Sequence, residues 1–268
     1  MNEQSSSDGT VGKALSLLDK VAAYERPVRF SELLAESDLP KATLYRLLQT
    51  LVSQRMLTSD ARSQGYSLGP RLIRLAHAAW RRASLAPVAR HHLDALSAVT
   101  GETIHLAQLD NAQVLYVDKR NATRPIPMFS DAGKIGPAYC TGIGKAILAF
   151  LDETERERAI AQQSFYRHTP YSLTDAQALR TQLETVRVTG IAHDREEHEP
   201  QIICIATPIL DASSRPLGGI SVTSSTTRTS LDALGRFRDD LRATAAAIAR
   251  DFAMFSLLDT GSPDRGAV

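Results

Sequence analysis

Near the start of the chain, apolar residues recur at helical spacing and the opposite positions are polar. The apolar face follows the i, i+3, i+4, i+7 and i+8 spacing of one buried helical side, and consists of Leu44, Leu47, Leu48, Leu51 and Val52. Pro40 fits the first helical position, because the missing N–H of proline costs nothing there. A shorter helix over residues 31–37 precedes this one, and Ser31 suits its N-cap.

The opposite face of the second helix carries hydrogen-bonding side chains and no acid. Its residues are Ala42, Arg46, Gln49 and Ser53, flanked by Thr43, Tyr45 and Thr50. Lys41 stands in the first turn, where backbone N–H groups are free. A surface helix without carboxylates, in a chain whose acids and bases balance, favours a partner that carries phosphates. The alternative is an ordinary helical hairpin with a solvated face.

Two neighbouring segments favour the first interpretation. Upstream, residues 11–28 predict a third helix, with one side formed by Val11, Leu15, Leu18 and Val21 or Ala22. Downstream, residues 56–69 predict a strand, a polar turn and a second strand. Three helices and a two-stranded ribbon make a winged helix–turn–helix domain over residues 11–69. Its wing tip would be Arg62, Ser63 and Gln64, where a cation can follow a phosphate backbone or enter a minor groove.

A helix over Pro70–Ala83 separates this domain from the rest of the chain. Its apolar positions are Leu72, Ile73, Leu75 and Ala76, and four arginines occupy other positions. We place a helical linker at residues 70–84. A rigid helix can transmit a shift between two domains, but a helix that merely packs fits this pattern equally well.

From residue 85 to residue 257 the pattern is mixed. Two hairpins are predicted over residues 103–120 and 203–224, with turns at Asp110–Asn111 and at residues 211–216. Helical segments are predicted at residues 87–99, 141–151, 152–163, 174–189 and 231–257. Thr174 would open the fourth of them. Helices that flank antiparallel hairpins indicate an α+β domain with one central antiparallel sheet.

Composition is that of a globular protein, with 43% hydrophobic and 23% charged residues. No apolar run approaches the ~20 residues that span a bilayer, so no membrane partner is expected. The ends of the chain, residues 1–10 and 258–268, are polar and are expected to be disordered tails, and no signal peptide is visible. Cys140 and Cys204 are therefore expected to be reduced thiols in a cytoplasm.

Charge is unevenly distributed, although the net charge is only +1. Residues 11–84 hold 12 Lys and Arg against 6 Asp and Glu, a balance of +6. Residues 85–268 hold 19 against 22, a balance of −3, and residues 1–10 add −2. The positive charge is concentrated in the predicted helix–turn–helix, where contacts to phosphates require it.

Two glycines precede the helix predicted after the first hairpin. Gly142 and Gly144 stand in the sequence PAYCTGIGK, so the backbone N–H groups at the helix start are uncovered. Such a start can bind a carboxylate. It is not a P-loop, because Tyr139 and Ala146 occupy positions that the Walker spacing reserves for Gly and for Ser or Thr. An ordinary helix cap is the alternative.

Two further segments are candidates for binding. Residues 193–204 contain the potential metal ligands His193, Asp194, Glu196, Glu197, His198 and Glu199, but their spacing matches no standard zinc signature. The segment is hydrophilic and leads into a strand, so a solvated loop is the default for most of it, although one or two members can face a pocket. On the last strand, Ser221 and Thr223 share one face. A buried hydroxyl needs a hydrogen-bond partner. These two hydroxyls therefore either line a cavity for a polar small molecule or face water.

The segments LPKATLYRLLQTL, GIGKAILA and DREEHEPQIICIATPILD, in this order, resemble the IclR family of bacterial transcriptional regulators over roughly residues 11–255. The resemblance implies a GAF-like effector-binding domain after the winged helix, and dimers that often pair into tetramers. It implies that the effector is a small organic acid or aromatic compound. The implied effector contacts are Gly142, Ile143, Asp194, Cys204, Ser221 and Thr223. Cys140–Thr141 departs from the family pattern and resembles members that answer sugar acids.

The sequence therefore predicts a ligand-controlled regulator, of the kind that represses or activates a catabolic operon, with no metal or cofactor. Arg46 and Gln49 are expected to contact base edges of operator DNA, whereas Lys41, Thr43, Tyr45 and Arg62 are expected at phosphates or groove walls. One rival is an enzyme that uses Cys140, His193, Asp194 and His198, which lacks a recognisable nucleophile and base. The other is a constitutive architectural DNA-binding protein.

Overall fold

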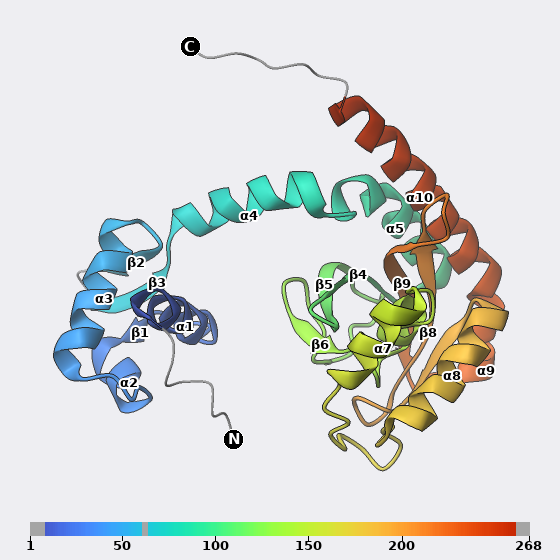
Figure 1. The fold of residues 1–268 in the computed structure, drawn as a ribbon, viewed down its shortest axis with the longest axis horizontal. Helices are drawn as coiled ribbons and strands as arrows, with labels where there is room; N and C mark the ends of the chain where they lie inside the picture. The colour runs from blue at the N-terminus through green and yellow to red at the C-terminus, as the bar shows by residue number, and fades with distance from the viewer. Residues whose placement is uncertain (1–8, 61–63, 261–268) are drawn as a thin grey trace. The chain divides into compact units, whose positions relative to one another are not determined.

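The computed structural model describes residues 9–60 and 64–260, and the chain divides into two compact units between Ala83 and Ser84 (Figure 1). The expected wing-tip residues Arg62 and Ser63 lie outside the described residues, as do most of the expected tails. Within the expected tails, however, Thr10 and residues 258–260 are helical.

The N-terminal unit is a winged helix–turn–helix. Its elements are α1 Thr10–Ala22, β1 Val28–Arg29, α2 Phe30–Ala35, α3 Lys41–Ser53, β2 Leu57–Asp60, β3 Gly65–Leu68 and α4 Pro70–Ala83. The wing has three strands in the order β1–β3–β2, one more than the predicted ribbon. The additional strand β1 is only two residues long, so it leaves no alternating pattern in the sequence.

The core of this unit is the leucine face of α3. Leu44 and Leu48 are fully buried, and they pack with apolar residues of α1, α2 and the wing. The predicted face of α1 is only partly right: Leu18 and Val21 are buried, but Val11 and Leu15 are 73% and 54% exposed. Leu17 turns inward instead. Apolar residues on more than one side of a short helix leave its orientation to packing.

Three helix starts differ from the predictions by one or two residues. Helix α2 begins at Phe30, and the Glu32 carboxylate accepts the Arg29 backbone N–H at 2.8 Å, so Ser31 is not the N-cap. Pro40 is the N-cap of α3 rather than its first residue. Asp175 caps α8 by accepting the Ala178 N–H at 2.8 Å, in place of Thr174. In each case the cap is decided by a local hydrogen bond or backbone angle.

The C-terminal unit is an α+β domain. Its helices are α5 Ala86–Thr100, α6 Gly142–Leu148, α7 Glu153–Ala161, α8 Ala176–Thr189, α9 Leu231–Leu234 and α10 Arg238–Thr260. Its strands are β4 Thr103–Asp110, β5 Gln113–Arg120, β6 Ile135–Pro137, β7 Ala192–Arg195, β8 Ile202–Leu210 and β9 Pro216–Ser225. The predicted closing helix is interrupted by a 3₁₀ turn at Gly235–Phe237, and the short strands β6 and β7 were not predicted.

One antiparallel sheet of six strands runs through this unit in the order β6–β5–β4–β9–β8–β7, which agrees with the predicted single central sheet. Both predicted hairpins are present, as β4–β5 and β8–β9. The first hairpin turns at Asn111 and Ala112, one residue later than predicted, with φ of 46° and 62°. Two positive φ values match the twist of a tight hairpin.

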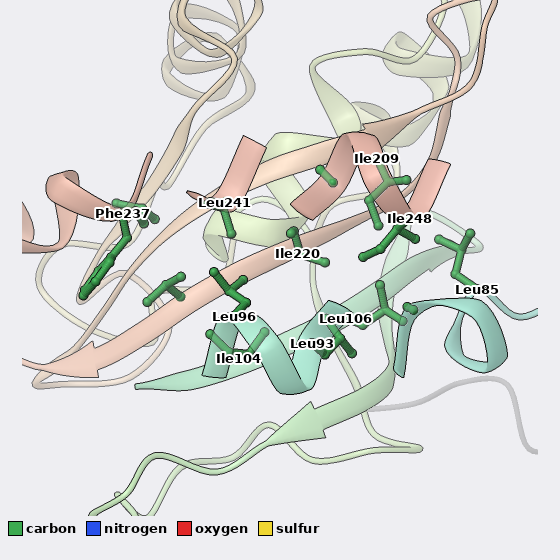
Figure 2. Close-up of a cluster of buried hydrophobic side chains, with 14 of the residues drawn as sticks. Leu85, Leu93, Leu96, Ile104, Leu106, Ile209, Ile220, Phe237, Leu241 and Ile248 are labelled. Carbon is green, nitrogen blue, oxygen red and sulfur yellow. The ribbon is translucent and has the colours of Figure 1, made fainter. Parts of the chain in front are cut away.

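Alternation along the strands gives the sheet two different faces. Ile104, Leu106 and Ile220 point to the side covered by α5 and α10, where they join Leu93 and Leu241 in an apolar cluster (Figure 2). The other face packs against α6, α7 and α8 around a second apolar cluster. Toward one end of that second face the apolar residues give way to polar ones. Among the described helices, none is both long and apolar enough to cross a membrane.

Candidate functional site

Strand register places three of the predicted effector residues in one row across the sheet. Thr223 pairs with Cys204 between β9 and β8, and Cys204 pairs with Asp194 between β8 and β7. In the adjacent row, Ser221 pairs with His105 of β4. All five side chains are buried. They line a cavity of about 30 Å³ together with Tyr116, Ser130, Thr141, Gly142, His198, Glu199 and Ile202. The hydroxyls of Ser221 and Thr223 therefore face this cavity and not water.

His105 is the centre of a buried hydrogen-bond network. Its Nδ1 lies 3.2 Å from Thr223 Oγ1 and 3.3 Å from Ser221 Oγ, and its Nε2 lies 2.9 Å from Ser130 Oγ. Burial lowers the pKa of His105 to about 3, so the imidazole is neutral near pH 7. A neutral imidazole donates from one ring nitrogen and accepts at the other. The sequence analysis missed His105, because its partners depend on strand pairing.

The start of α6 packs closely against the sheet through two glycines. A Cβ on Gly142 would lie 2.5 Å from Cys204 Sγ, and one on Gly144 would lie 2.4 Å from the Ala138 carbonyl oxygen. The Gly142 backbone therefore lies directly beside the Cys204 sulfur. Ile143 is not among the residues that line the cavity, and its side chain belongs to the apolar cluster.

Neither thiol has the environment of a nucleophile. Burial raises the pKa of Cys140 to about 12 and raises that of Cys204 as well, and the nearby Asp194 acts in the same direction. Both groups are therefore protonated at neutral pH. His193 and Asp194, which the enzyme interpretation combined, are adjacent on β7, so their side chains leave opposite faces of the sheet.

A buried ion pair supports the segment after β7. Lys145 Nζ lies 2.5 and 2.6 Å from the two carboxylate oxygens of Glu197, and donates to Gln182 Oε1 at 2.7 Å. The Lys145 and Glu197 side chains are 0% and 3% exposed. The expectation of a solvated loop for most of residues 193–204 is therefore wrong, because the segment begins in β7 and Asp194 and Glu197 are buried. Members of the segment do face a pocket, as the sequence allowed: Asp194, His198 and Glu199 line the cavity. Neither Lys145 nor Glu197 was predicted as a site residue.

Asp194 has an unusual electrostatic environment. Burial is the main cause that raises its pKa from 3.8 to about 7, and the nearby Lys145 opposes this shift. Asp194 Oδ1 accepts the backbone N–H of Glu197 at 2.8 Å. The carboxyl group can therefore accept a hydrogen bond from a ligand hydroxyl when ionised, or donate one when protonated.

Because the pKa of Asp194 is raised on folding, its ionisation opposes folding. Its favourable contribution is complete below the unfolded pKa of 3.8 and is lost as the pH rises through about 7. We expect the wild type to gain stability relative to Asp194→Asn when the pH falls from about 8 to about 5, as measured by urea unfolding. The depressed pKa values of His105, His193 and His198 affect both variants and cancel. An equal stability difference at both pH values would contradict this assignment, and the exposed Asp110→Asn serves as control.

The segment between β5 and β6 closes the cavity. The Phe129 backbone N–H donates to both carboxylate oxygens of Glu199, at 3.0 and 2.9 Å, and the next residue is Ser130 of the His105 network. The Phe129 ring also contacts His198 edge-on, at 5.5 Å between centroids. The cavity they border has a volume of about 30 Å³. We expect a ligand larger than this volume to displace some of these contacts.

In the N-terminal unit, α3 presents the predicted polar face. Lys41, Tyr45, Arg46 and Gln49 are exposed, and Thr43 is half-buried. Tyr45 packs edge-on against Phe30, at 6.2 Å between ring centroids. Lys41, Tyr45 and Gln49 line a groove that continues to Gln64 and Tyr66 of the wing. Arg62 lies outside the described residues.

A winged helix–turn–helix, followed by a unit with an enclosed polar cavity, defines the class of DNA-binding transcriptional regulators. Residues 10–61 match the family model of the IclR helix-turn-helix domain, and residues 77–250 match that of the bacterial transcriptional regulator IclR C-terminal domain. The chain belongs to the IclR family of bacterial transcriptional regulators.

Proteins that are similar to this chain over most of their length are transcriptional regulators. The HTH-type transcriptional regulator KdgR of Escherichia coli strain K12 is 31% identical over 248 residues, which cover 92% of this chain and 94% of the relative. KdgR of Dickeya chrysanthemi is 33% identical over 232 residues, or 87% and 76% of the two chains. The crystal structure of Thermotoga maritima IclR aligns with a TM-score of 0.75 at 29% identity, over 90% of this chain and 97% of that one. These relatives are DNA-binding regulators rather than enzymes.

Proposed function

We propose that this protein is a cytoplasmic regulator of a catabolic operon, and that a small hydroxy or keto acid, such as a sugar acid, controls its binding to operator DNA. The observation that carries the proposal is the cavity on the polar face of the sheet. His105, Ser221 and Thr223 offer donors and acceptors in a space shielded from water. Such groups select ligands that can satisfy them, because buried polar groups left unpaired are costly.

The charge of the cavity favours a ligand with hydroxyl groups beside its carboxylate. Asp194 and Glu199 both line the cavity, and burial raises the pKa of each. A carboxylate placed against an ionised Asp194 would be repelled, whereas a ligand hydroxyl can donate to it. The start of α6, where Gly142 lines the cavity, suits the carboxylate.

An aromatic acid is the second candidate. The Tyr116 ring lines the cavity and lies 5.3 Å from the His105 ring, so one wall can stack against a flat ligand. Hydroxyl and keto groups can form hydrogen bonds with more of the polar residues that line the cavity than an unsubstituted aromatic ring can. This difference supports the first candidate.

On the DNA side, we propose that α3 enters the major groove. Arg46 and Gln49 contact base edges there, while Lys41, Thr43, Tyr45 and Arg62 contact phosphates or groove walls. Dimers, or tetramers built from them, place two such helices on a palindromic operator. The exposed Val11 and Leu15 on α1 support self-association, because adjacent exposed apolar residues often mark a protein contact.

The test is a thermal-shift screen of the full chain against hydroxy and keto acids, unsubstituted acids of the same length, and aromatic acids. We expect hydroxy or keto acids alone to raise the unfolding midpoint and to change binding to an operator fragment selected from random DNA. The double variant Ser221→Ala/Thr223→Val should lose the response. Ser225→Ala removes a hydroxyl from the same strand outside the cavity, and should keep it.

Three other outcomes would count against parts of the proposal. Stabilisation by unsubstituted acids to the same extent would reject the role of the hydroxyls. Stabilisation by aromatic acids alone would favour the second candidate. Intact DNA binding with no response to any class would favour the constitutive architectural protein.

A further inference from the structure

Two histidines of α5 and one aspartate of α10 converge on the side of the sheet opposite the cavity. His92 Nε2 lies 2.8 Å from Asp251 Oδ2, and His91 Nε2 lies 3.6 Å from the same oxygen. The two imidazole rings lie 3.8 Å apart between centroids. One ligand atom from each of the three residues lies within 4.8 Å of the others.

The convergence of the two histidines does not follow from their sequence positions alone. Neighbouring residues of an α-helix point roughly 100° apart, because 3.6 residues complete a turn. His91 nevertheless directs its ring toward Asp251, although its side chain is 68% exposed and open to water. Both rings therefore present a nitrogen to one point between α5 and α10.

The separations suit a transition-metal ion. Zinc binds imidazole nitrogen and carboxylate oxygen at about 2.0–2.2 Å, so tetrahedral ligands lie roughly 3.4 Å apart. The observed 2.8 and 3.6 Å bracket this separation, so small side-chain rotations bring the three atoms around one ion. The exposure of His91 and Asp251 leaves the fourth position to water.

We propose that His91, His92 and Asp251 form a binding site for a divalent transition-metal ion, with Zn²⁺ as its representative. Two neutral imidazoles and one carboxylate are ligands that such ions accept. The ion joins α5, which begins at Ala86 directly after the linker helix α4, to the long helix α10. It therefore stabilises the covering layer of the sheet independently of any effector.

The test is calorimetric titration of Zn²⁺ into the full chain, prepared without a polyhistidine tag and freed of metal with a chelator. We expect one ion to bind per chain at this site and to raise the midpoint of thermal unfolding. His91→Ala and Asp251→Asn should each weaken binding by roughly tenfold or more, because loss of a direct ligand costs at least as much as loss of an outer-shell partner.

His77→Ala provides the matched control, since it removes an exposed histidine that is not part of the trio. It should leave Zn²⁺ affinity unchanged. The proposal is overturned if the wild type binds no Zn²⁺. It is equally overturned if His91→Ala and Asp251→Asn bind Zn²⁺ as tightly as the wild type, which would place the ion elsewhere. The metal-free variants should unfold in one cooperative transition, which separates lost ligands from lost folding.

Discussion

Lys145→Met is expected to lower the free energy of unfolding by about 3–5 kcal/mol, because it leaves Glu197 as an unpaired charge inside the unit. Lys145 donates to both carboxylate oxygens of Glu197 and to Gln182, and it is fully buried. In a unit of this size, each kcal/mol corresponds to about 2–4 °C, so the unfolding midpoint should fall by roughly 6–20 °C. Thermal and urea unfolding of the full chain measure both quantities.

The matched control is the ion pair between Arg180 and Glu157, which joins α8 to α7 at 2.7 Å and whose side chains are 38% and 43% exposed. Arg180→Met should cost less than about 1 kcal/mol, because solvent screens an exposed pair. The double variant Lys145→Met/Glu197→Leu should recover most of the lost stability, since no unpaired charge remains. If the double variant were as unstable as Lys145→Met, the unpaired charge would not be the cause.

Arg46→Ala is expected to weaken binding to the selected operator by about 1–3 kcal/mol, or roughly 5–150-fold, with affinity for the effector unchanged. Arg46 is exposed on α3, on the face opposite the buried Leu44 and Leu48, so its removal leaves the core of the unit intact. Fluorescence anisotropy with labelled operator, at fixed salt concentration, measures this effect.

Arg46→Lys separates base recognition from simple charge. Lysine keeps the positive charge but lacks the planar fork that pairs with two acceptors of one base. We expect it to bind unrelated DNA like the wild type but the operator more weakly. Full operator affinity in Arg46→Lys would make Arg46 a phosphate contact, and full affinity in Arg46→Ala would remove it from the interface.

The winged helix could be predicted because its signals are local. The apolar face of α3 repeats over several turns, so both its identity and its buried side are visible in the sequence. The orientation of α1 could not be predicted, because Val11 and Leu15 fit an apolar helical face as well as Leu17 does. Packing against α3 and the wing decides between them, and this information is not in the helix itself.

The candidate site was predicted in part. Because side chains alternate along a strand, the sequence predicts that Ser221 and Thr223 share one face. Only the register between strands brings Cys204 and Asp194 beside them. His105 comes from a strand far away in the sequence, and its role depends entirely on the sheet order. The Lys145–Glu197 pair was missed for the same reason, since its members are 52 residues apart.

We expect the contacts of Phe129 with Glu199, and of Ser130 with His105, to govern also how fast the cavity can respond. If an effector needs more room than the cavity of about 30 Å³, it binds only the fraction of chains in which these contacts are broken. Its apparent dissociation constant equals the intrinsic constant divided by that fraction. In stopped-flow mixing, the observed binding rate should therefore level off at high ligand concentration, at the rate with which the closed cavity opens.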